Sequence, residues 1–192
     1  MKQFRVLLTF ICLTLAGLAQ SQTTDSLDGR KALMFSFNGL NLGGGFGAKY
    51  WISGSTALRF TLAGSYRDSK LTSFDIDQSE TISITVTPGI GVEKHYGLTE
   101  NLSAYLGGGF SYSFNSNQNK FYSDIQYTKT ITDTYAGTLF VGVEYWITRS
   151  ISLSGEQQIS LSYDVRTRNF AGENKDFEFG NSTSTLQLLI YF

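Results

Sequence analysis

Hydrophobic and polar residues alternate along several long stretches of this sequence. From Thr81 to Tyr96, isoleucine and valine recur at alternate positions, with serine, threonine, glycine and Glu93 between them. Residues 101–114 and 151–163 show the same period of two. Because successive side chains of a strand point to opposite faces, each stretch predicts a strand with one apolar and one polar face. No segment shows a convincing helical period.

Three hairpins share a sequence pattern. Segments 47–52, 91–96 and 142–147 each begin with glycine and place a charged residue third, and a short polar turn follows each of them. A leucine comes after each turn at the same offset. This repetition favours an up-and-down barrel, in which tight turns join consecutive strands, over an enzyme fold.

The predicted fold is all-β, an eight-stranded antiparallel up-and-down transmembrane β-barrel. The strands are expected at about 31–38, 43–52, 55–67, 80–96, 101–114, 130–147, 150–164 and 181–192. The first two could instead form one bent strand, but eight strands are preferred because an even number of strands closes the sheet. Short turns at 53–54, 97–100 and 148–149 alternate with long polar loops at 68–79, 115–129 and 165–180. This asymmetry is typical of outer-membrane barrels.

The polar face indicates which side of the barrel faces outward. A soluble surface usually carries about 25–35% charged residues, whereas the polar strand positions here are mainly serine, threonine, glycine and glutamine. Such small side chains fit the narrow lumen of an eight-stranded barrel. The apolar face is therefore expected to contact lipid. An aromatic girdle is predicted at Tyr50, Tyr66, Tyr112, Tyr145 and Tyr163.

The start of the chain has the features of an export signal. Lys2 and Arg5 precede an apolar run at 6–18 and small residues suited to cleavage before Gln20. We assign 1–19 to a signal peptide, 20–30 to a short periplasmic segment and 31–192 to the barrel domain. The single cysteine lies inside the signal, so the exported chain has no thiol for a disulfide or a metal.

Charged residues on the predicted inner face are the main candidate site. The hairpin repeat places Lys49, Glu93 and Glu144 at one height, and Arg59 and Glu156 lie on inward positions of the strands that follow. Opposite charges in a poorly hydrated lumen should pair, because an unpaired buried charge costs several kcal/mol. The network is expected to act as a structural plug, with an ion gate as the alternative.

Other features are weaker. His95 is the only histidine, and its phase matches Trp51 and Trp146, which predicts packing at the rim and no catalysis. The glycines at 43–48 precede a strand and not a helix, so no nucleotide site is expected there. No cofactor and no metal are expected either. Gln157 on the apolar face and Pro88 inside a strand depart from the pattern, and a bulge could accommodate either.

The closing strand carries a family resemblance. Residues 184–192 alternate, with Leu186, Leu188, Ile190 and Phe192 on one face. This end resembles the small outer-membrane barrels of the OmpX and OmpA type. The resemblance implies an outer-membrane location and a terminal aromatic, Phe192, that is read by the barrel-assembly machinery. It also implies strands that continue above the membrane.

These features favour a non-enzymatic integral outer-membrane protein with a filled polar lumen and a structural or surface-interaction role for its outer loops. A narrow pore for ions or very small solutes is one alternative, and a secreted lipocalin-like carrier is another. The expected partners are outer-membrane lipids, the assembly machinery and an unidentified surface partner. The net charge of −1 gives no basic footprint for nucleic acid. We expect a monomer.

Overall fold

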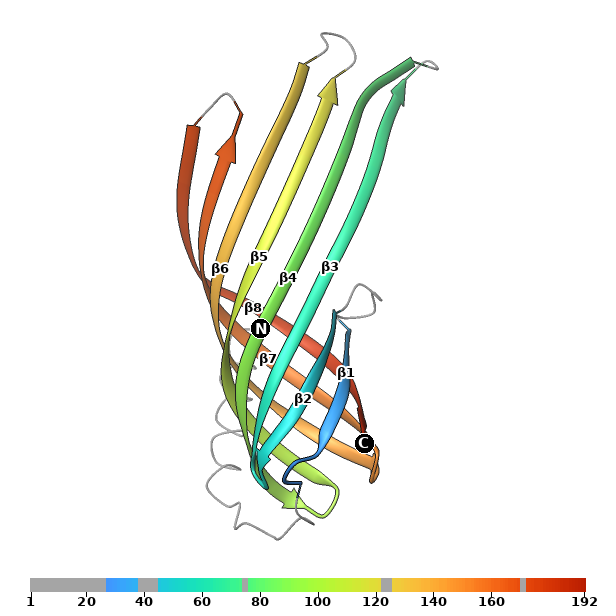
Figure 1. Cartoon of the computed structure of the whole chain (residues 1–192), viewed down its shortest axis with the longest axis vertical. Helices are drawn as coiled ribbons and strands as arrows, with labels where there is room; N and C mark the ends of the chain where they lie inside the picture. Colours follow the sequence, from blue (N-terminus) through green and yellow to red (C-terminus); the bar gives the residue numbers. More distant parts are fainter. Residues whose placement is uncertain (1–26, 38–44, 74–75, 122–125, 170–171) are drawn as a thin grey trace, which may run out of the picture.

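The chain forms one closed antiparallel barrel (Figure 1). The computed structural model describes residues 27–37, 45–73, 76–121, 126–169 and 172–192, so the predicted signal peptide lies outside the described residues. None of the described residues forms a helix long and apolar enough to cross a bilayer. The eight strands are β1 (Lys31–Phe37), β2 (Gly45–Ser53), β3 (Thr56–Ser73), β4 (Ile76–Thr99), β5 (Leu102–Phe121), β6 (Gln126–Thr148), β7 (Ile151–Arg168) and β8 (Gly172–Tyr191).

Each strand pairs with the next, and β8 pairs with β1 to close the sheet. The predicted eight-stranded barrel is confirmed. β1 and β2 are separate strands, paired antiparallel from Lys31 and Tyr50 to Phe35 and Phe46, so the alternative of one bent strand is wrong. Closure leaves no free edge in the barrel wall, and every wall strand pairs on both sides.

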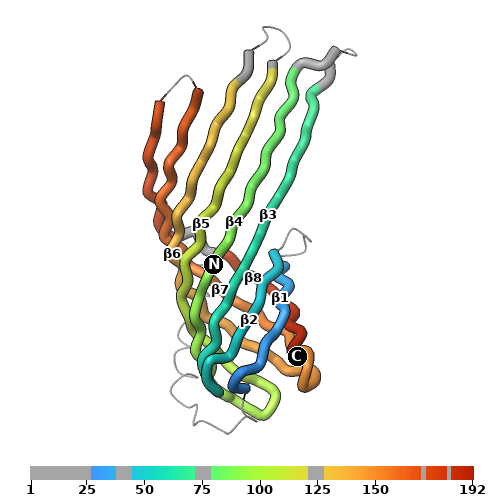
Figure 2. Tube along the Cα trace, viewed as in Figure 1, coloured from blue at the N-terminus to red at the C-terminus, as the bar shows by residue number. Residues whose placement is uncertain are grey.

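The three segments expected as long loops are mostly strand. β3 and β4 stay paired as far as Ser73 and Ile76, and the β5–β6 and β7–β8 hairpins also extend far beyond β1 and β2 (Figures 1 and 2). Alternation did not reveal these extensions, because polar residues occupy both faces over most of their length, and the apolar Phe177 and Phe179 do not continue the phase of the wall part of β8. The backbone ladder nevertheless continues there. We call this side of the barrel the long-hairpin end and the opposite side the short-turn end.

The apolar face of the barrel points outward. Ile84, Leu106 and Leu161 are 44%, 50% and 40% exposed on the outer surface. A lipocalin-like carrier needs these side chains in a common dry interior, so that alternative is wrong. Tyr50, Tyr66, Tyr145 and Tyr163 are also exposed on the outer surface.

Tyr112, the fifth tyrosine assigned to the girdle, is half-buried. Its hydroxyl donates a hydrogen bond of 2.5 Å to Asp133 Oδ1, and its ring lies 5.3 Å from the ring of Tyr135. The aromatic contact between β5 and β6 therefore continues to Tyr135, which is itself exposed.

Neither residue that departed from the pattern sits at a bulge. Pro88 faces Leu62 of β3, and the β4–β5 register is the same on both sides of it. Gln157 lies on the outer face, where Ser184 of β8 donates a hydrogen bond of 2.6 Å to its Oε1. This bond offsets part of the cost of an amide in an apolar surface.

A bulge does occur elsewhere, at Gly180 of β8. Ser160 pairs with Asn181 but Leu161 pairs with Phe179, so Gly180 is an extra residue, and its φ is +96°. The extra residue changes the phase of β8. Phe177 and Phe179 thereby face outward beside Tyr163 and Leu161, whereas an unbroken strand would turn them inward.

Candidate functional site in the barrel lumen

Five charged side chains meet in the lumen and form what we call the luminal plug. Arg59 Nη1 of β3 lies 2.5 Å from Glu156 Oε2 of β7 and 3.4 Å from Glu93 Oε2 of β4. Lys49 of β2 contacts Glu93 Oε1, and its Nζ lies 3.1 Å from Glu144 Oε2 of β6. All five residues are buried. The ion pairs therefore run without a break from one wall of the barrel to the other.

Hydroxyl groups donate further hydrogen bonds to the carboxylates of the luminal plug. Tyr105 donates a 3.0 Å hydrogen bond to Glu156 Oε2, and Tyr191 donates a 2.7 Å bond to Glu144 Oε1. Ser152 donates a further 2.5 Å bond to the same oxygen of Glu144. Such bonds matter because a buried ion pair compensates its desolvation only when the remaining lone pairs are also satisfied.

Glycines on the inner face make room for the side chains that cross the lumen. A Cβ at Gly142 would lie 2.5 Å from the Tyr105 hydroxyl and 2.7 Å from the Gly155 carbonyl oxygen. A Cβ at Gly107 would collide with the ring of Phe140. The glycine that opens the third hairpin repeat thus has a packing role.

His95 belongs to this network and not to the rim. Its Nε2 lies 2.8 Å from Glu93 Oε1 and its Nδ1 lies 3.2 Å from Ser103 Oγ. Its ring lies 4.5 Å from the ring of Trp51 and 5.0 Å from that of Tyr105. His95 is buried, so it lies inside the lumen and not at the predicted rim, and it packs there against the equally buried Trp51.

The order Glu93, His95, Ser103 has the connectivity of an acid–histidine–serine triad. All three side chains are buried, and Glu93 is also held by Lys49 and Arg59. A nucleophile needs access to a substrate and donors placed for an oxyanion. The geometry here suits a static polar cluster better than acyl transfer.

The same region contains a set of metal-ligand types. One ligand atom from each of Glu93, His95 and Glu144 lies within 4.8 Å of the others. The ammonium group of Lys49, however, contacts both carboxylates and supplies the positive charge between them. The donor set therefore fits an ion pair better than a metal site.

A second layer closes the lumen nearer the short-turn end. Trp51 and Ala57 lie two residues closer to the turn than Lys49 and Arg59, and they are fully buried. We call the cluster around them the apolar floor; it consists of Leu27, Ala32, Met34, Trp51, Ala57, Leu189 and Tyr191.

The segment before β1 helps to form this floor. Gly29 N donates a 2.9 Å hydrogen bond to the Trp51 carbonyl, which places Leu27 inside the cluster. The Arg30 guanidinium lies 5.9 Å from the centre of the Trp146 ring and 5.6 Å from that of Tyr191. Residues 27–30 therefore pack over the short-turn end of the barrel.

The structure thus brings together all five charged residues that the sequence placed in the lumen. Sequence reasoning missed the large side chains beside them, namely Tyr105, Phe140, Leu189 and Tyr191. A signal was available: Tyr191 precedes the outward Phe192, so the period of two places it inward. The assumption of a lumen filled by small polar groups obscured that signal.

No protein-family model and no curated protein matches this sequence. Among solved structures, a major outer membrane protein from Thermus thermophilus superposes with a TM-score of 0.54 at 13% identity, covering 85% of this chain and 99% of that one.

Two further solved structures are similar. The N-terminal β-barrel domain of Pseudomonas aeruginosa OprF gives a TM-score of 0.47 at 12% identity, covering 89% of this chain and 100% of the domain. The attachment invasion locus protein Ail of Yersinia pestis gives 0.49 at 12% identity, covering 86% and 99%. Because the Thermus protein is only 13% identical to this chain, its similarity shows the fold alone, and that fold is an outer-membrane barrel.

Proposed function

We propose that this chain, which has the eight-stranded barrel fold of the OmpX and OmpA type, is a non-enzymatic integral protein of a bacterial outer membrane. In this proposal its barrel is closed by the luminal plug, and its protruding strands contact a partner at the cell surface. The observation that carries the proposal is the combination of an apolar outer wall with a lumen sealed by ion pairs.

The outer wall supports a membrane location. Soluble monomers rarely expose apolar patches larger than a few hundred Å², whereas here every wall strand contributes exposed aliphatic or aromatic side chains. They include Leu33, Ile52, Phe60, Ile90, Phe110, Val143, Ile159 and Ile190. Lipid is the solvent that matches such a surface, and a closed barrel satisfies its backbone hydrogen bonds in lipid.

The lumen supports a closed barrel over a narrow pore. An ion crossing it would have to displace the ion pairs of the luminal plug and then pass the apolar floor around Trp51. Both layers are buried. The pore alternative therefore receives less support than a structural role.

The protruding strands support a surface interaction. Among the described residues, β2 pairs with β3 only as far as Gly45 and Ala63, and β1 pairs with β8 only as far as Phe37 and Leu186. The outer parts of β3 and β8 thus present backbone N–H and C=O groups along two edges. Such edges can bind an extended segment of a partner through main-chain hydrogen bonds.

Amine labelling of intact cells, followed by fractionation, tests location and orientation together. Lys70 and Lys175 on the protruding hairpins have side chains that are 53% and 59% exposed, and Lys94 lies on the outer face near the short-turn end. A membrane-impermeant reagent should label Lys70 and Lys175 but not Lys94. The protein should fractionate with the outer membrane and show heat-modifiable gel mobility. A freely soluble exported chain, or labelling of Lys94 alone, would contradict the proposal.

A further inference from the structure

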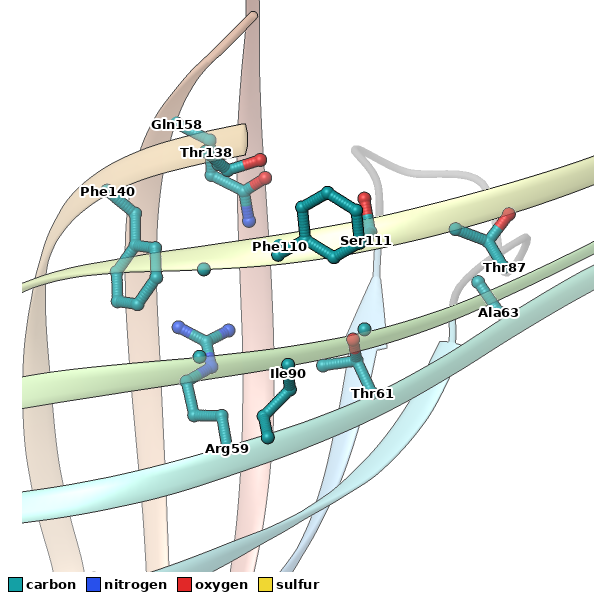
Figure 3. Close-up of a pocket in the computed structure, with 13 residues that line it drawn as sticks. Arg59, Thr61, Ala63, Thr87, Ile90, Phe110, Ser111, Thr138, Phe140 and Gln158 are labelled. Atoms are coloured by element: carbon teal, nitrogen blue, oxygen red, sulfur yellow. The ribbon is translucent and has the colours of Figure 1, made fainter. Parts of the chain in front are cut away.

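The lumen contains a cavity that the luminal plug does not fill. It measures about 190 Å³, begins directly beyond Arg59 on the long-hairpin side and is surrounded by β3 to β7 (Figure 3). Thr61 and Gln158 lie two residues farther from the short turns than Arg59 and Glu156. Among the described residues, the luminal plug and the apolar floor close the cavity toward the short-turn end, so a ligand would enter from the long-hairpin end.

Hydroxyl groups line the walls of this cavity on three different strands. Thr61 of β3, Ser111 of β5 and Thr138 of β6 project into the same space (Figure 3). Within the described part of the chain, no hydrogen bond involves these three hydroxyls. The Thr87 hydroxyl, by contrast, donates a 2.8 Å bond to Ser113. The three groups are therefore available both to donate and to accept.

The base of the cavity is polar, and the charged residue in its lining, Arg59, is compensated by carboxylates. The Arg59 guanidinium is paired with Glu156 and Glu93, and Gln158 donates a 2.6 Å hydrogen bond to Glu156 Oε1. A base compensated in this way gives a free anion or cation little advantage over a neutral molecule.

An apolar surface lies beside the hydroxyls. The ring of Phe140 lies 4.5 Å from Arg59 Cζ, and a Cβ at Gly91 would lie only 3.6 Å from Phe140 Cε1. Gly91 and Phe140 both line the cavity, so the ring supplies an apolar contact surface there. Hydroxyl partners on several sides with one aromatic surface suit a molecule that carries both hydroxyl groups and C–H faces.

From this arrangement we propose that the outer half of the lumen binds a single neutral sugar ring. The cavity is too small for the body of an oligosaccharide, so the ring is either a free monosaccharide or the terminal residue of a longer glycan. This inference concerns a ligand site and is independent of the proposed surface role.

The test uses the purified protein folded in detergent micelles, with threonine methyl groups labelled for NMR. Glucose, galactose and xylose are titrated separately. At least one sugar should produce saturable shifts at Thr61 and Thr138, with a Kd on the order of 1 mM. Thr130, which faces the same way on β6 but does not line the cavity, should not respond. If no sugar gives saturable shifts, or if all threonines shift alike, the proposal is wrong.

Two variants make the test specific. Thr138→Val keeps the shape and removes one hydroxyl, and it should weaken binding about fivefold, whereas Thr130→Val should leave the affinity unchanged. Ser111→Phe should fill the cavity and abolish binding, with heat-modifiable gel mobility as the check on folding. Unchanged affinity in both cavity variants would overturn the proposal. Maltotriose binding as tightly as glucose would assign the end of a glycan chain, and binding of glucose alone would assign a free sugar.

Discussion

At the scale of single residues, the luminal plug depends on complete pairing. Lys49 is shared by Glu93 and Glu144, and Arg59 is shared by Glu93 and Glu156. Removal of one partner leaves others buried without compensation, which costs about 3–5 kcal/mol. The sequence was sufficient to place these five residues in the lumen, because each lies on the polar face of a strand. It could not give the pairing, which depends on the register across the barrel.

The first prediction concerns Lys49. Lys49→Met should lower the free energy of unfolding by about 3–5 kcal/mol, because Glu93 and Glu144 lose a shared cation in a dry environment. Urea unfolding in detergent micelles measures the change. Lys70→Met is the control, since Lys70 and Glu80 lie 3.9 Å apart and the lysine is exposed, so the change should stay within about 0.5 kcal/mol. Equal effects of the two substitutions would contradict a role for the luminal plug in stability.

Gly142 gives a second prediction at this scale. Gly142→Ala should destabilise the barrel by about 1–3 kcal/mol, because the new methyl group meets the Tyr105 hydroxyl and the Gly155 backbone. Gly137 lies on the same strand, and nothing comes within 4 Å of a Cβ placed there. Gly137→Ala should therefore be nearly neutral in the same urea experiment. A neutral Gly142→Ala would mean that Tyr105 can leave its position without cost.

At the scale of strands, the alternation of hydrophobic and polar residues predicted a strand only where its two faces contact different surroundings. Where one face of a strand contacts apolar surroundings, as in β4 from Ile84 to Val92, alternation predicted both the strand and its orientation. Above the barrel wall, Thr81 donates a 2.8 Å hydrogen bond to Asn119 Oδ1 on the inner face, and Lys120 Nζ lies 3.2 Å from Glu80 Oε2 on the outer face. Nothing in such a sequence distinguishes strand from loop. The phase change at Gly180 was also hidden, because one glycine gives no periodic signal.

The bulge at Gly180 is open to a direct test. Its φ of +96° lies in the region that side chains with a branched Cβ avoid, so Gly180→Val should cost about 1–3 kcal/mol. Gly180→Asn should cost less, because asparagine tolerates positive φ better. Amide hydrogen exchange should show faster exchange at residues 172–179 in the valine variant and unchanged exchange in the β3–β4 hairpin. Equal exchange in both variants would indicate that the strand adopts another register without strain.

At the scale of the whole molecule, the barrel is divided along its axis. The apolar floor closes the short-turn end, the luminal plug crosses the middle and the polar cavity opens toward the long hairpins. Two of these three layers obstruct an ion, and they do so by different physical means. One presents apolar side chains around Trp51, and the other presents charges that already have partners.

This layering predicts silence in planar bilayers. The wild-type protein should give no discrete conductance steps, and Glu93→Gln should remain silent as well, because neutralising one carboxylate leaves the Trp51 layer in place. A porin with an open lumen, inserted from the same detergent, shows that the bilayer detects channels. Folding of each variant is checked by heat-modifiable mobility before recording. Steps from the wild-type protein would favour the narrow pore, and steps from Glu93→Gln alone would show that the luminal plug is the main barrier and the apolar floor is permeable.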